Sequence, residues 1–339
     1  MSAPYSTHTF AINLFQYGYI IVIPIISLIG FLLNGVCIIV FSNRNLKEKI
    51  HFYLMTKSFI EMLLLAIFVF IPYDSCIDCA SFETYGSILF SMWINGYLGY
   101  SLHLFDSIIE IVITINRFFI IKSSEKILAN IKDKIFIFIC GFISMIIFVP
   151  NLFLYEIESY KTKEGTQAFY LEQKNSDPYL LYFINNATAF VDVITLLILL
   201  PVNIAVIVQF KRFIDKKNRL TISNLIPIPQ RTNVIRPTKK RKTETKFNKM
   251  ILLVSFLFIL VRIGEIIPYI FLHSIRVDDP NFDPNISNDM VDITSIIKIF
   301  SQFISCIIIS ANFFVYYSFN TPFKVFFFKL FLCKNLPQT

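Results

Sequence analysis

Charged residues are scarce in this sequence of 339 residues. Lys, Arg, Asp and Glu together make up 16% of it, whereas 55% of the residues are hydrophobic and 38 are Phe. Soluble globular domains contain about 25% charged and about 45–50% apolar residues. The scarcity of charge therefore argues against a soluble domain and indicates a membrane protein. Internal repeats are also lacking, which argues against an array fold.

Charge is absent altogether from residues 1–16, which contain no Lys, Arg, Asp or Glu. A cleaved signal peptide begins with a positively charged segment and ends at a small-residue cleavage site. Neither feature is clear here, so we expect the first long apolar run to stay in the protein as an anchor. Residues 1–16 then form an N-terminal tail.

Seven apolar runs are long enough to cross a bilayer, for which a helix needs about 20 residues. The third run is longer than one crossing requires, so its helix is either tilted or begins later than the run does. We expect an all-α membrane protein, with a seven-helix domain over residues 17–321 and a tail over 322–339. The expected helices span about 17–41, 51–72, 90–121, 135–155, 180–210, 248–271 and 293–318.

The connections between these runs alternate in charge. Lys and Arg concentrate in the loops that face the cytoplasm. The first, third and fifth connections and the C-terminal tail are basic, most strongly in "TKKRKTETK" at 238–246, whereas the second, fourth and sixth are acidic. This alternation predicts an N-terminus outside the cell, a C-terminus inside, and seven helices between them.

The third run carries acids and a base in a segment that is otherwise apolar, "SIIEIVITINRFFII" at 107–121. Helical positions three or four apart share a face. Two carboxylates near mid-membrane cost about 5–7 kcal/mol on the insertion scale, so this face must point to protein or trapped water. Ionisable residues inside membrane helices are functional candidates; structural hydrogen bonds within the bundle are the alternative. The polar stripe comprises Gly99, His103, Asp106, Glu110, Thr114 (or its neighbour Ile113) and Arg117.

Several motifs on the expected helices match those of one receptor family. The third helix ends in Asn116-Arg117-Phe118, and the seventh contains Asn312 and Tyr316 followed by "FNTPFKVFFFKLFLC". With these motifs the sequence resembles the rhodopsin-like G-protein-coupled receptors over about residues 17–333. The other matching positions are Asn34, Leu54, Glu61, Pro201, Lys249, Phe258, the pair Phe323-Lys324 and Cys333.

The sequence departs from the family pattern at three places. Asn116 stands where the family has an acid, and Phe313 stands where its Asn-Pro-x-x-Tyr motif has proline. The segment 261–264, "VRIG", stands where the family has Cys-Trp-x-Pro, so the tryptophan and the proline are both missing. These departures resemble the nematode chemoreceptor-type branches of the family.

The resemblance implies a receptor that binds an extracellular small molecule or peptide and activates a heterotrimeric G protein. It implies residence in the plasma membrane, which in a chemosensory cell includes a sensory cilium, and contact with lipid but not with nucleic acid. It also implies a short amphipathic eighth helix in the tail. The residues that the resemblance assigns to G-protein coupling and activation are Asn116, Arg117, Phe118, Lys249, Asn312 and Tyr316.

A polar site in the middle of the bundle is also implied, where many family members bind sodium. Two buried carboxylates side by side either share a cation or hold one proton. We therefore expect a cation- or proton-coupled switch, with sodium as the candidate ion and no other cofactor. Its expected residues are Asn34, Glu61, Asp106, Glu110 and Asn312.

The ligand pocket is expected in the outer half of the bundle. Arg262 and Glu265 lie three residues apart, so pairing with each other is an alternative to ligand contact. We expect Asp192 and Lys298 near helix ends, where snorkelling is the alternative to ligand contact. Gly99 stands where amine receptors carry Asp, and Cys306 stands where opsins carry the retinal lysine. We therefore expect neither an amine receptor nor a photopigment. The expected pocket comprises Gly99, His103, Asp192, Arg262, Glu265, Lys298 and Gln302.

The covalent and metal chemistry is limited. The family's disulfide to the second outer loop cannot form, because residues 156–179 contain no cysteine. Cys76 and Cys79 form the one pair of cysteines on the expected outer face and could oxidise there. Cys333 is a palmitoylation candidate. Asn285 and Asn186 begin glycosylation sequons, of which Asn186 lies close to the membrane.

Two other functions are weighed against a receptor. A ligand-gated cation channel or transporter would use the polar stripe as an ion path, but the two related halves of many transporters are not visible. A membrane enzyme is the third choice. The four histidines are scattered without metal-ligand spacing, and no nucleophile motif is present. The sequence therefore predicts neither a metal site nor an enzyme.

Overall fold

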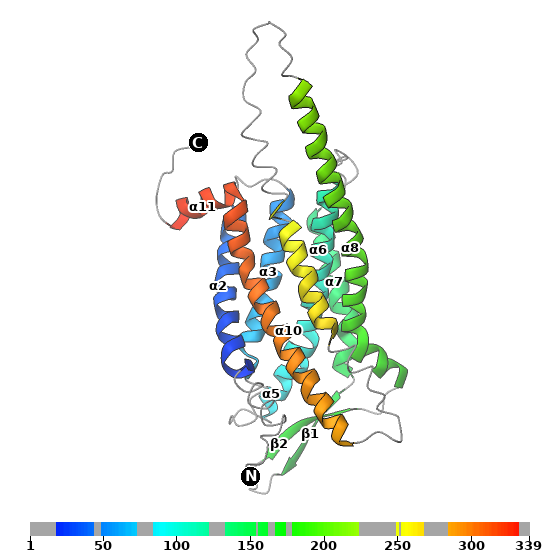
Figure 1. Ribbon diagram of the computed structural model, residues 1–339. Coiled ribbons are helices and arrows are strands. Elements are labelled where there is room, and N and C mark those ends of the chain that lie inside the picture. The colour runs from blue at the N-terminus through cyan, green and yellow to red at the C-terminus, as the bar shows by residue number, and fades with distance from the viewer. Residues whose placement is uncertain are drawn as a thin grey trace, which may run out of the picture.

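The computed structural model describes residues 18–43, 49–72, 84–121, 133–153, 155–161, 167–173, 178–223, 249–250, 252–267 and 284–331. Long helices run side by side along one axis, with a short β-hairpin at one end and a short helix at the other (Figure 1). Six of these helices are long and apolar enough to span a membrane. The helical residues 252–267, drawn in yellow in Figure 1, supply the sixth helix of the seven-helix bundle.

The helix bounds follow the apolar runs, with differences at several ends. Among the described residues up to 121, the helical elements are η1 (Gly18–Val22), α2 (Ile23–Phe41), α3 (Lys49–Val69), α5 (Tyr85–Leu89), η2 (Phe90–Gly99) and α6 (Tyr100–Ile121). After α6 come α7 (Asp133–Phe148), η4 (Val149–Phe153), α8 (Pro178–Ser223), α10 (Pro284–Phe319) and α11 (Thr321–Phe331), with the helix 252–267 between α8 and α10. Both α8 and α10 run beyond the apolar segments that predicted them, and α8 projects past the bundle in Figure 1.

The third membrane helix begins earlier than its apolar run, not later. It starts at Tyr85, where the Thr84 side chain accepts a hydrogen bond from the backbone N–H of Ser87. Ser and Thr at this position satisfy one of the free N–H groups at a helix start. The next ten residues, Phe90–Gly99, form a π-helix, a rare geometry that is frequent at functional sites.

A β-hairpin lies at the end of the bundle that the loop charges place outside the cell. Its strands, β1 (Tyr155–Lys161) and β2 (Gln167–Gln173), pair antiparallel, with Ile157 opposite Leu171. Phe169 packs on Tyr85 with a ring distance of 5.5 Å, which ties the hairpin to the start of the third membrane helix. This hairpin was not among the elements predicted from the sequence.

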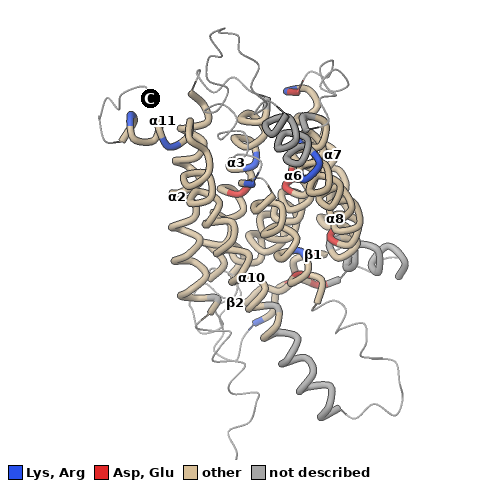
Figure 2. The backbone as a smooth tube through the Cα atoms, turned by 45° about the horizontal axis from the view of Figure 1, so that its top comes forward, with Lys and Arg blue, Asp and Glu red and all other residues tan. Residues whose placement is uncertain are grey.

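Lipid-facing surfaces account for many of the exposed apolar side chains. On α7 and α8 most of the outward residues are large and hydrophobic, for example Phe138 at 73% exposed and Leu197 at 69%. Charged residues are sparse along the membrane helices, as the tan backbone in Figure 2 shows. An aqueous protein would not expose so much contiguous apolar surface.

Gly30 allows α2 and α10 to approach closely. A Cβ at this position would lie 2.0 Å from Ser310 Oγ and 2.9 Å from Leu65 Cδ1. We expect Gly30→Ala to destabilise the bundle by about 1–3 kcal/mol through overpacking, measured as a lower midpoint of thermal unfolding in detergent. The matched control is Gly35→Ala on the same helix, whose Cβ would meet only Met62 Sδ at 3.9 Å. Equal midpoints for the two variants would contradict this packing.

The predicted eighth helix is present as α11. Asn320 Oδ1 accepts a hydrogen bond from the backbone N–H of Phe323 at 3.1 Å and so begins the helix. Phe323 is fully buried against Phe41, with ring centroids 5.2 Å apart. These contacts hold α11 against the end of α2 that the loop charges place in the cytoplasm.

Candidate functional site

A buried lysine lies in the middle of the bundle, surrounded by three acids. Lys57 is 1% exposed, and its Nζ lies 3.0 Å from Asp106, 3.1 Å from Glu61 and 3.4 Å from Glu110. Lys57 and Glu61 come from α3, one helical turn apart, and both other acids come from α6. Charges buried in this way are stable only when they are paired. We call these four residues the lysine cage.

Polar side chains from two other helices complete the lysine cage. The Asn312 amide of α10 donates to Glu61 Oε1 at 2.7 Å. The Ser255 hydroxyl of the helix 252–267 donates to Glu110 Oε1 at 2.5 Å and also lies 3.1 Å from Thr114 Oγ1. Four membrane helices therefore meet at these carboxylates.

A second charged cluster lies closer to the outer end, around Arg262. Its Nη1 lies 2.9 Å from Glu265 Oε2 and 3.2 Å from Asp192 Oδ1, and it contacts the ring of His103. His103 Nε2 lies 2.9 Å from Asp192 Oδ1. The Ser305 hydroxyl of α10 donates to Glu265 Oε1 at 3.2 Å. We call Arg262, His103, Asp192 and Glu265 the arginine cluster.

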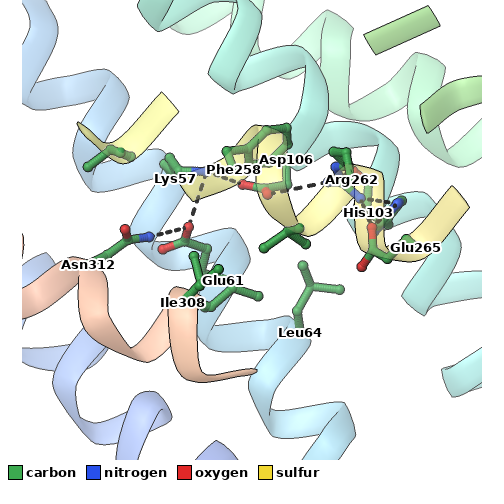
Figure 3. Close-up of a pocket in the computed structure, with 13 residues that line it drawn as sticks. Lys57, Glu61, Leu64, His103, Asp106, Phe258, Arg262, Glu265, Ile308 and Asn312 are labelled. Atoms are coloured by element: carbon green, nitrogen blue, oxygen red, sulfur yellow. Dashed lines mark hydrogen bonds and ion pairs between the residues drawn. The ribbon is translucent and has the colours of Figure 1, made fainter. Parts of the chain in front are cut away.

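Asp106 connects the lysine cage to the arginine cluster. Its Oδ1 lies 3.0 Å from Lys57 Nζ, and its Oδ2 lies 3.7 Å from Arg262 Nη2. Phe258 lies beside both cations, with its ring centroid 4.7 Å from Lys57 Nζ and 4.4 Å from Arg262 Cζ. Figure 3 shows the resulting chain of contacts from Asn312 through Glu61, Lys57 and Asp106 to Arg262, His103 and Glu265.

A small cavity of about 30 Å³ lies along this chain of contacts. It offers room for about two water molecules, each of which needs at least ~10–15 Å³ on this measure. Its walls come from α3, α6, α10 and the helix 252–267, and include Glu61, Asp106, Arg262 and Asn312. The cavity therefore lies between the two clusters, with a mostly apolar lining that charged side chains interrupt.

The structure brings together four of the seven residues expected in the ligand pocket, namely the members of the arginine cluster. Arg262 and Glu265 do pair, as the alternative reading proposed. Asp192 was wrongly placed near a helix end: α8 begins at Pro178, and Asp192 is fully buried in its interior, so snorkelling is excluded. Its contacts with His103 and Arg262 account for this burial.

Of the other three expected pocket residues, Gly99 and Gln302 are not among those that line the cavity. Gly99 ends the π-helix, and a Cβ there would face Ile94 O at 3.5 Å. Gln302 is half-buried on α10. Lys298 is also on α10, but its side chain is outside the described residues.

The residues expected at the sodium site do not all lie together. Glu61, Asp106, Glu110 and Asn312 meet at Lys57. The Asn34 amide instead donates to Gly30 O within its own helix, at 3.1 Å. The cation shared by the carboxylates in this structure is thus a lysine ammonium, and the binding of sodium stays a prediction.

The residues expected to couple to a G protein lie toward the cytoplasmic end. Arg117 and Asn116 of α6 are buried, and Phe118 is half-buried beside Phe119. Tyr316 is fully buried and packs edge-on against Phe41 at 5.3 Å. Lys249, in the short described stretch 249–250, is exposed. Their role in coupling stays a prediction.

Sequence reasoning missed Lys57 and Ser255. A signal for Lys57 was available, because it stands four residues before Glu61 and the pair shares a helix face. Ser255 carried no such signal, since its partner Glu110 is 145 positions away. The absence of a metal site was predicted from the spacing of the histidines along the chain. In the structure, however, His103, Asp192 and Glu265 converge from three helices.

The remaining covalent candidates lie outside the described residues. This holds for Cys76, Cys79 and Cys333, and for the side chains of Asn186 in α8 and Asn285 in the first turn of α10. Disulfide formation, palmitoylation and glycosylation stay predictions.

Known proteins resemble this chain in sequence and in fold. The sequence matches a family described as serpentine type 7TM GPCR chemoreceptor Srx over residues 25–224, more than half of the chain. The fold is similar to squid rhodopsin, at 12% identity and a TM-score of 0.64, over 95% of this chain and 86% of that one. No curated protein sequence matches the chain. The family match, together with the seven-helix bundle, shows that this chain belongs to the serpentine Srx family of seven-transmembrane G-protein-coupled chemoreceptors.

Proposed function

We propose that this receptor lies in the plasma membrane, binds an extracellular chemical ligand at the arginine cluster and activates a heterotrimeric G protein. The observation that carries the proposal is the position of Asp106, which holds Lys57 of α3 through one oxygen and lies beside Arg262 of the helix 252–267 through the other. A change in the charge or position of the arginine cluster therefore acts on the lysine cage through Asp106.

The resting state is held by contacts between the sixth helix and its neighbours. Arg262 binds Asp192 of α8, and Ser255 binds Glu110 of α6. A ligand that competes for Arg262 or for its acids weakens these contacts. Such a ligand favours the bundle state in which the sixth helix is free to move, by as much as its affinities for the two states differ.

Lys57 supplies the positive charge that the mid-bundle acids require. A mobile ion leaves such a site by diffusion, whereas an ammonium on α3 leaves it only when helices or side chains move. We therefore propose that the switch in this receptor depends on Lys57 rather than on dissolved sodium. The position of Nζ, within 3.4 Å of all three carboxylates, supports this proposal.

Complex formation with Gα subunits in nucleotide-depleted membranes tests the proposed activity. We expect the wild-type receptor to retain at least one member of a Gα panel and Arg117→Ala to lose it. Lys134→Ala is the matched control, because Lys134 is an exposed base at the start of α7, at the same end of the bundle. Retention of Gα by Arg117→Ala, or binding of no Gα by the wild type, would sink the proposal.

A further inference from the structure

We propose that His103, Asp192 and Glu265 form a binding site for a divalent transition-metal ion such as Zn²⁺, which Arg262 and the ion occupy in turn. The proposal goes beyond the receptor activity, since it concerns what the arginine cluster binds whether or not a G protein responds. It is carried by four observations, on ligand geometry, on the position of the guanidinium, on a buried oxygen without a partner and on access.

The three side chains offer one ligand atom each from three different helices. These atoms all lie within 4.8 Å of one another. His103 Nε2 lies 2.9 Å from Asp192 Oδ1 and 3.6 Å from Glu265 Oε2. Ligand atoms about 2.0–2.2 Å from a tetrahedral Zn²⁺ lie about 3.4 Å apart. The side chains therefore need only small rotations to enclose one ion.

Arg262 already places a positive charge among the three ligand atoms. Its Nη1 lies 2.9 Å from Glu265 Oε2 and 3.2 Å from Asp192 Oδ1 and contacts the ring of His103. A guanidinium cannot be deprotonated in proteins, so it and a metal ion exclude each other by charge as well as by space. The guanidinium marks the point on which the field of the two carboxylates converges.

One carboxylate oxygen of the site is unused. Asp192 is fully buried. Within the part of the chain that the structure describes, its Oδ2 atom nevertheless has no hydrogen-bond partner. An unsatisfied oxygen of a buried carboxylate is costly. A divalent ion can bind both oxygens of the carboxylate and satisfy the atom that Arg262 leaves without a partner.

Access and room are available on opposite sides of the site. The side chains of His103 and Glu265 are 18% and 21% exposed, whereas that of Asp192 is 0% exposed. An ion can therefore enter past His103 and Glu265. On the inner side, Arg262 Nη2 lies 3.7 Å from Asp106 Oδ2, beside the cavity of about 30 Å³. Arg262 can turn toward Asp106 while the ion binds.

One imidazole and two carboxylates leave a fourth coordination position for water or a ligand atom, as in catalytic zinc sites. Binding would draw α6, α8 and the helix 252–267 together in their outer halves. It would also push the charge of Arg262 toward the lysine cage. Imidazole with carboxylate suits Zn²⁺ and its neighbours in the first transition row better than Ca²⁺ or Mg²⁺.

Titration of the purified full-length receptor with Co²⁺, which reports four- or five-coordinate nitrogen and oxygen ligands by visible absorption, tests the proposal. The protein must carry no histidine tag, and Zn²⁺ should displace the Co²⁺. We expect Arg262→Gln to bind about tenfold more tightly or better, because the competing cation is gone, and His103→Gln to lose the absorption. Glu158→Gln, which alters an exposed carboxylate of the outer hairpin, should bind as the wild type does.

Several results would overturn the proposal. Equal absorption in all variants would show adventitious metal binding only, and unchanged or weaker binding by Arg262→Gln would show that Arg262 does not compete. Where His103→Gln fails to fold, Glu265→Gln serves as the second ligand variant, because this side chain is partly exposed; it should weaken binding about tenfold. Metal binding and Gα retention are separate readouts, so failure of one leaves the other standing.

Discussion

Replacing Lys57 with methionine should lower the free energy of unfolding by about 3–5 kcal/mol, because three carboxylates would stay buried without their cation. Thermal unfolding of the purified receptor in sodium-free buffer measures this loss. We further expect the midpoint of Lys57→Met to rise as Na⁺ replaces choline at constant ionic strength, since the vacated lysine cage can accept the ion. The wild-type midpoint should not depend on this exchange.

Lys134→Met is the control for loss of a lysine as such, because Lys134 is exposed; it should change stability by less than about 0.5 kcal/mol. The double variant Lys57→Met/Glu61→Gln should recover part of the loss, since it removes one of the unpaired charges. An unfolding midpoint of Lys57→Met equal to that of the wild type would refute the lysine cage. A sodium dependence already present in the wild type would instead restore sodium as the natural cation.

Replacing Asp106 with asparagine should raise ligand-free signalling. The substitution removes the charge that holds Lys57 and faces Arg262, so the sixth helix loses its electrostatic connection to α3 and α6. A coupling of about 1–3 kcal/mol, the usual range between linked sites, shifts the resting-to-active equilibrium about 5- to 150-fold. Basal nucleotide exchange on the Gα that the wild type retains is the measurement.

The control for Asp106→Asn is Ser107→Ala at the next position. Ser107 is also buried, but its hydroxyl donates to His103 O within the same helix, so among the described residues it bonds to no other helix. Basal exchange should be unchanged in this control. If Asp106→Asn signals no more than Ser107→Ala does, Asp106 does not connect the two clusters energetically.

Helical periodicity and the cost of charge in lipid predicted the part of the site on the third helix, and the family resemblance added residues such as Glu61 and Asn312. Asp106 and Glu110 were assigned to the protein-facing side of the third helix because carboxylates cannot face lipid, and both are buried there. The sequence could not show that Lys57 neutralises them, since periodicity describes one helix and this contact joins two. Nor could it give the burial of Asp192, because its partners His103 and Arg262 come from two other helices.

The fold was predictable where the bilayer constrains the chain and less so at the ends of the helices. The lengths of the apolar runs predicted seven helical spans. An unpaired backbone group is costly in lipid, and a helix pairs its backbone groups within the segment. The π-helix at Phe90–Gly99 gave no sequence signal, since its hydrogen bonding leaves the composition unchanged. The strand Tyr155–Lys161 lies outside the bilayer, where hydropathy says little about structure.

The small volume of the cavity affects the apparent dissociation constant of any odorant-sized compound. Drug-sized ligands occupy pockets of about 300–1,000 Å³, whereas this cavity holds about 30 Å³. The conformation in Figure 3 therefore has no room there for such a ligand, whose binding would need a more open species of the receptor. If that species makes up about 1% of the molecules, the apparent dissociation constant is about 100-fold weaker than the intrinsic one. An agonist whose intrinsic dissociation constant for the opened pocket is about 10 nM would then bind with an apparent constant of about 1 μM.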